Sequence, residues 1–200
     1  MRRFSLVIIA ILFSSSAGAE CFNNFATSYK DRFIVHDDGT LTDRLTGLMW
    51  MRCNLGHRWD QAKKTCSNDD GIKAYSWTEA LTTAATIRAG GVPGDQDLQP
   101  FGDYTDWRLP NIKEISSIIM RQCSTLETFR IDPYYFVNPG GNYWSSTPGT
   151  KALKTKETDF IVENSAWIGN FKLGRAEQVA MSLPQSVRLV RNAINNLVGN

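Results

Sequence analysis

The sequence has 200 residues, 42% of them hydrophobic and 21% charged, which is enough apolar material for the core of one domain. The formal net charge is +2, and it falls to zero without Arg2 and Arg3, because 20 basic residues then match the 20 acidic ones. Whole-protein charge therefore gives no reason to expect nucleic acid or another polyanion as a partner. Any such binding needs a local patch.

Residues 1–19 have the pattern of a signal peptide. Two arginines precede the apolar run Phe4–Phe13, and small residues suit cleavage after Ala19. The run is too short to span a bilayer comfortably, which argues against a retained anchor, and a lipoprotein signal needs a small residue where Glu20 stands. We expect an exported protein, periplasmic or secreted to the cell surface, with a single domain over residues 20–200.

Four cysteines in an exported chain suggest two disulfides, and four cysteines allow three connectivities. Cys53 and Cys66 flank a loop with little apolar periodicity, so we pair them, because such a loop has no core of its own to fix it. Cys21 then pairs with Cys123 and ties the mature N-terminus to the end of a helix. A Cys/His metal site with His57 is the alternative, but the spacing and the compartment argue against it.

The first half of the chain predicts strands followed by a helix. Residues 32–51 contain a β-rich run, a turn signal, a weakly alternating run and a final apolar run, which together indicate a hairpin and a third short strand. Ser76 and Glu79 have the spacing of a capping box. Apolar residues follow at helical intervals until Gly90, so we expect a helix over residues 77–89.

The stretch DWRLPNIKEI, residues 106–115, predicts a structural joint in front of a second helix. Pro110 moves its neighbours out of helical geometry, and Asn111 with Glu114 repeats the capping spacing. We expect this helix over residues 112–122. The full set of residues that we assign to structural motifs is Trp107, Arg108, Pro110, Asn111, Glu114, Trp144, Arg188 and Arg191.

After the fourth cysteine, aromatic and turn residues dominate and β-like runs are short. The runs cover 158–163, 166–173, 178–183 and 187–191, whereas the polar segment 149–157 predicts an exposed loop. A hairpin, two helices and then several short strands predict an α+β fold with antiparallel strands and long loops.

The motifs of catalysis are missing from the sequence. It has no Gly-x-Ser-x-Gly turn, no phosphate-binding glycine loop and no His-Glu-x-x-His zinc signature. Both histidines, His36 and His57, lie in the N-terminal third, and we expect His36 to be a solvent-facing residue at a strand end. We therefore assign no catalytic residue, no metal ligand and no cofactor, and expect a protein that is not an enzyme.

One acidic loop is the exception to the absence of metal signals. Asp95, Asp97, Asp103 and Asp106 lie close together in sequence, and oxygen-rich loops of this kind can hold calcium outside the cell. The spacing matches no defined calcium loop, and acidic surface loops are common. Calcium therefore stays an alternative to a solvated loop.

A local basic patch is the candidate binding site. Lysines cluster after residue 150, and two further cations belong to a predicted hairpin downstream, as an anionic glycan would require. Trp59 and Trp167 are the tryptophans that we expect to be exposed, and Trp167 would serve as an aromatic platform. A solvated loop is the structural alternative. The predicted ligand-binding residues are Lys151, Lys154, Lys156, Trp167, Lys172 and Arg175.

Six segments together resemble the bacterial Lcl C-terminal domain family, a domain of unknown function. They are DGTLTDRLTGLMWMRC (38–53), CNLGHRWD (53–60), SWTEAL (76–81), DWRLPNIKEI (106–115), YWSST (143–147) and VRLVR (187–191). They occur in the family's order and cover nearly all of the mature chain. The chain departs from the family in the long acidic stretch from Gly90 to Asp106, where members usually have a short glycine-rich turn.

The resemblance implies a C-type-lectin-like fold, of the broad class shared with formylglycine-generating enzymes, and binding of a ligand outside the cell. The implied ligands are anionic glycans or a cell-surface partner, as in adhesion. A structural part of an envelope or pilus assembly is the alternative. A formylglycine-generating catalyst ranks lowest, because such relatives need two cysteines late in the fold and no cysteine follows Cys123. The motifs of calcium-dependent lectins are also absent.

Overall fold

A computed structural model describes residues 31–67, 73–91, 102, 104–120, 129–154 and 160–193, with only the backbone described for 151–154 and 160–163. Several predictions therefore fall outside the described residues. They are the signal peptide at 1–19, the pairing of Cys21 with Cys123, the glycan-binding assignment of Lys156, and the calcium assignment of Asp95, Asp97 and Asp103.

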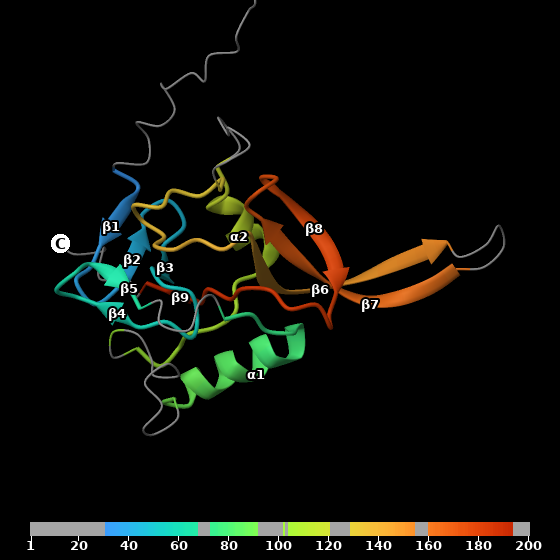
Figure 1. The fold of residues 1–200 in the computed structure, drawn as a ribbon. Helices are drawn as coiled ribbons and strands as arrows, with labels where there is room; N and C mark the ends of the chain where they lie inside the picture. Colours follow the sequence, from blue (N-terminus) through green and yellow to red (C-terminus); the bar gives the residue numbers. More distant parts are fainter. Residues whose placement is uncertain are drawn as a thin grey trace, which may run out of the picture.

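The predicted N-terminal hairpin and third strand are confirmed, and the C-terminal end of the described chain completes their sheet. Strands β1 (Phe33–Val35), β2 (Thr40–Asp43), β3 (Leu48–Met51) and β9 (Val190–Asn192) are antiparallel neighbours in this order. Every residue of β2 and β3 is buried. The middle of the sheet is therefore buried, and Figure 1 shows its blue and red strands at the side of the molecule opposite β7 and β8.

The predicted disulfide between Cys53 and Cys66 is confirmed. It joins Cys53, two residues after β3, to strand β5 (Thr65–Cys66), which pairs with β4 (Trp59–Asp60) in a hairpin with two residues in each strand. The Cα atoms of the two cysteines are 5.6 Å apart, and both residues are buried. A hairpin this short has little core of its own, so the bridge supplies its attachment to the larger sheet.

Both helices begin where the capping signals predict. Helix α1 (Trp77–Arg88) starts after Ser76, and its capping box with Glu79 is complete. Helix α2 (Ile112–Ser117) starts after Asn111 with a second complete capping box. The predicted extension of α2 to residue 122 is wrong, because the Met120 N–H donates to the Arg130 carbonyl at 2.8 Å instead of continuing the helix.

The third sheet differs most from the prediction. Strands β6 (Asn142–Lys154), β7 (Phe160–Asn170) and β8 (Arg175–Ala180) are antiparallel in this order. The expected loop at 149–157 is wrong as far as Lys154, because residues 148–154 pair with residues 160–166 of β7. Strand β8 pairs only with residues 165–170, so the rest of the hairpin continues as a two-stranded arm that projects from the body in Figure 1.

Two apolar clusters form the core. One gathers Trp50, Phe136 and Ile115 between the first sheet and α2, and the other gathers Trp107, Trp144 and α1 residues against β7. All three of these tryptophans are fully buried. Small antiparallel sheets and two helices make the domain α+β, and no helix among the described residues is long and apolar enough to cross a membrane.

Candidate binding surface

The stretch 106–115 makes contacts that join distant parts of the chain. Arg108 pairs with Val190 through two backbone hydrogen bonds of 2.9 Å, which attaches the stretch to the last strand. The Arg108 guanidinium donates to both carboxylate oxygens of Glu114 at 2.8 and 2.7 Å. Burial alone would raise the pKa of Glu114, but the hydrogen bonds from Arg108 and from the Asn111 N–H hold it below its ordinary value.

The end of this stretch is attached to β6. The Pro110 carbonyl accepts the Ser146 N–H at 2.7 Å, and the Ile112 N–H donates to the Thr147 hydroxyl at 3.0 Å. Trp107 is fully buried in the second cluster. The backbone of the predicted joint thus holds the start of α2 against two sheets, and the buried Trp107 side chain packs in the core beside it.

Asp106 is the one member of the predicted calcium set that the structure describes, and it is bound to an arginine. Its carboxylate accepts from Arg191, whose side chain is 3% exposed, and the Arg191 guanidinium also lies 4.0 Å from the centre of the Tyr104 ring. Within the described ranges, no group of three or more His, Cys, Asp or Glu side chains is placed to hold a metal ion.

Arg188 sits at the centre of a buried polar network. Its guanidinium donates to the carbonyls of Met51 and Arg52 and to Asn54 Oδ1. The Tyr143 hydroxyl donates to the same Asn54 oxygen at 2.7 Å and lies 3.3 Å from Arg188. Trp144, the other predicted structural residue here, is fully buried and donates its indole N–H to the Tyr75 carbonyl.

Arg52 extends this network to the surface. It donates to the Tyr134 carbonyl at 2.6 Å and to the Tyr135 carbonyl at 3.1 Å, and its guanidinium lies 4.6 Å from the Trp59 ring centre. Burial, with the positive charge of nearby Arg188, lowers the pKa of Arg52. Two buried cations are therefore close together, and their hydrogen bonds within the described part of the chain go to neutral oxygens.

The structure does not bring the predicted basic residues into one patch. Lys151 and Lys154 lie on the arm, in register with residues at the start of β7, whereas Arg175 pairs with Asn170 at its end. Lys172 is exposed in the turn between β7 and β8. Ten residues of strand separate the two ends of β7, or roughly 33 Å at the usual rise.

Trp167 also lies apart from Arg175. It is only partly exposed and pairs with Gln178, three residues along β8 from Arg175. Successive residues of a strand point to opposite faces, so an odd separation places the two side chains on opposite faces of the sheet. Trp167 therefore does not form the platform of a shared site with Arg175.

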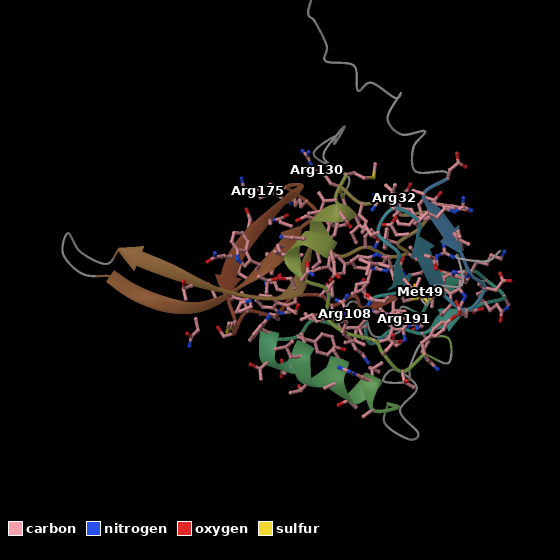
Figure 2. All side chains as sticks on the ribbon, turned by 180° about the vertical axis from the view of Figure 1, so that it is seen from behind. Arg32, Met49, Arg108, Arg130, Arg175 and Arg191 are labelled. Carbon is pink, nitrogen blue, oxygen red and sulfur yellow. A yellow bond between two sulfur atoms is a disulfide. The ribbon has the colours of Figure 1, made fainter. Side chains whose placement is uncertain are left out.

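A residue that sequence analysis did not select joins the turn cations. The Arg130 side chain packs over Gly174, which has a positive φ of 70° in the β7–β8 turn. The backbone N–H of Arg130 donates to the Phe171 carbonyl at 2.6 Å. Figure 2 shows Arg130 and Arg175 near each other at this end of the sheet. No local signal marks Arg130, because more than 40 positions separate it from the turn that it covers.

These contacts define a basic and apolar area that we call the turn surface. Phe129 and Leu173 expose 40% and 48% of their area beside the cations. Arg175 forms an ion pair with Glu177 at 2.5 Å, so the carboxylate partly neutralises the positive charge there. Lys172 is exposed. The turn surface consists of Phe129, Arg130, Lys172, Leu173 and Arg175.

Comparison with known proteins identifies the domain over most of its length. The family model of the Lcl C-terminal domain matches residues 39–191. This span runs from the first β-turn to the last described strand, and it includes the joint, the arginine network and the turn surface. No curated protein matches the chain.

Proposed function

The chain belongs to the Lcl C-terminal domain family, and we propose that it acts as an exported, non-catalytic binding domain that recognises anionic glycans through the turn surface. The observation that carries this proposal is the gathering of Arg130, Lys172 and Arg175 beside two exposed apolar side chains. Cations beside apolar surface suit a sulfated or carboxylated sugar, since the sugar combines anionic groups with apolar ring faces.

Several further observations support a role in binding. The buried Arg188 and Asn54 and the partly buried Glu114 bond to structural partners, as expected of a scaffold. The confirmed disulfide suits an oxidising compartment, as the signal-peptide pattern of the first 19 residues also does. We further propose that the α+β arrangement is of the C-type-lectin-like kind.

Heparin affinity chromatography of the oxidised protein tests this function. We expect the variant Lys172→Glu/Arg175→Glu to elute at lower salt, with affinity reduced roughly tenfold, because each exposed charge pair is worth about 0.2–1 kcal/mol. The matched control is Lys151→Glu/Lys154→Glu, which makes the same charge change on the arm. Equal retention of the turn variant and the wild type would overturn the proposal. A loss confined to the arm variant would move the site to the arm.

The arm favours a second function, as a structural component of an envelope or pilus assembly. The Asn164 carbonyl accepts the Met181 N–H, so its backbone groups face the β8 side. Backbone groups two residues apart in a strand point to the same side, so the Val162 N–H also faces the β8 side. At Val162 β8 has already ended, and no described strand pairs with this edge of β7. An open strand edge of this kind is where another chain can add a strand.

A pair of proline variants tests this second function. Val162→Pro removes the N–H that faces the open edge of β7, whereas Ala152→Pro, on the same rung, removes one that faces the opposite edge. We expect chemical cross-linking in cells to retain envelope adducts with Ala152→Pro and to lose them with Val162→Pro. Identical adducts from both variants would rule out strand addition at this edge.

A further inference from the structure

Tyr134 is a large aromatic side chain whose position the backbone fixes. The side chain is 68% exposed. Its carbonyl accepts from Arg52 at 2.6 Å and its N–H donates to the Asp132 carboxylate at 2.9 Å, so both of its backbone polar groups are bound. The ring meets that of Tyr135 edge to face, with centres 4.9 Å apart and planes at 85°. The ring is thus held in place while most of its area faces solvent.

The segment of chain that carries Tyr134 also carries two residues of the turn surface, Phe129 and Arg130. Tyr134 lies four positions after Arg130, and four steps of extended chain span at most about 14 Å. In Figure 1 the segment that follows α2, drawn in yellow, runs from the β8 end of the molecule toward the first sheet. A short oligosaccharide bound at the turn surface therefore has Tyr134 within reach.

Charges of both signs lie near Tyr134, because two buried arginines stand behind its backbone and the Asp132 carboxylate accepts its N–H. Arg52 contacts the backbone of Tyr134, and Arg188 is close enough to influence the Arg52 charge. The hydrogen bonds of both arginines within the described ranges go to neutral oxygens, so their positive charges have no carboxylate partner there. A low-dielectric interior transmits such a charge to the nearby surface better than water does.

We propose that Tyr134 is a stacking subsite for one pyranose ring of the anionic glycan whose charged groups bind the turn surface. This inference rests on the proposed function, because the two areas share one ligand. The apolar face of the sugar stacks on the exposed ring, and the acidic substituents of neighbouring units bind Arg130 and Lys172. The ligand class is an anionic polysaccharide of several units, since one unit stacks on the ring while its neighbours bind the cations.

Titration with heparin fragments of defined length tests the subsite. We expect Tyr134→Ala to weaken binding of the longer fragments about three- to tenfold, the range of an aromatic contact, and to leave disaccharide binding unchanged. The dependence of affinity on salt should keep its slope, because no charge is removed. Tyr134→Phe should restore wild-type affinity. The matched control is Leu183→Ala, which truncates another exposed apolar side chain (46%) at the end of β8.

The variants separate the subsite from the function on which it rests. Lys172→Glu/Arg175→Glu should reduce both the affinity and the salt slope. If that variant weakens binding and Tyr134→Ala does not, the subsite is wrong and the proposed function stands. If only Tyr134→Ala weakens binding, the shared ligand is wrong, and with it the proposed function. A lower melting temperature for Tyr134→Ala but not for Tyr134→Phe, with equal affinities, would assign the ring a structural role and overturn the subsite.

Discussion

Replacing Arg188 by methionine should remove a large part of the stability of the domain. Methionine fills a similar apolar volume but cannot donate to the five oxygens that Arg188 contacts. Two of these acceptors keep another donor, since the Arg52 carbonyl accepts the Val137 N–H and Asn54 Oδ1 accepts the Tyr143 hydroxyl. At these two acceptors the loss is that of the bond itself, because neither is left without a donor.

The magnitude follows from the number of bonds. The three bonds to Met51, Arg52 and Asn54 contribute roughly 1 kcal/mol each, or more because the donor is charged. Removing a buried cation offsets part of this loss, because its desolvation penalty disappears. We expect a net loss of about 3 kcal/mol, a large share of the roughly 5–15 kcal/mol that stabilises a domain.

Urea unfolding followed by tryptophan fluorescence measures this loss, and the three fully buried tryptophans provide the signal. Arg188→Lys should lose nearly as much free energy of unfolding, because a single ammonium group cannot reach the acceptors of both terminal guanidinium nitrogens. Arg44→Met at an exposed turn position is the matched control and should change stability by less than about 0.5 kcal/mol. A free energy of unfolding for Arg188→Met within about 1 kcal/mol of the wild type would refute the assignment of Arg188 as the centre of the network.

Three further perturbations have defined outcomes. Burial alone would raise the pKa of Asp43, but hydrogen bonds from its arginine and threonine partners hold it below its ordinary value. Its contribution to stability is therefore present above the unfolded pKa and is lost as pH falls through the folded pKa. Asp43→Asn should accordingly weaken the dependence of stability on pH in the acid range. Replacing Cys53 and Cys66 by serine should cost about 2–4 kcal/mol in urea unfolding under oxidising conditions and nothing under reducing ones. Gly169→Ala should lower the melting temperature, because the added Cβ meets Ile115, and Ile115→Ala should restore part of the loss when both are present.

Local signals predicted the beginnings of elements better than their ends. Each capping box spans only four residues, one starting at Ser76 and the other at Asn111, and each marks the start of a helix. Helix α2 ends early for a reason that no local pattern contains, since Arg130 takes the N–H of Met120 from across the fold. Strand β6 was missed in the same way, because its lysines resemble a loop until pairing with β7 is known.

The candidate site depended even more on distant contacts. The sequence prediction selected cations and one tryptophan and grouped them by sequence proximity. The fold instead separates the lysines of the arm from the turn and brings Arg130 to the turn through one backbone hydrogen bond. Tyr134 stood out only after its exposed fraction and its arginine-bound carbonyl were known.

The position of β9 makes the first sheet depend on a contact between distant parts of the chain. It completes the sheet of β1, β2 and β3 and also pairs with Arg108. The sheet that begins with the N-terminal strands is therefore complete only when the last described strand has joined it. Contacts between residues about 140 positions apart carry a large loop-closure cost, which slows folding. The N-terminal strands consequently stay without their final neighbour until residues 190–192 are available. During that interval the edge of β3 that β9 later covers is open to pairing with another strand.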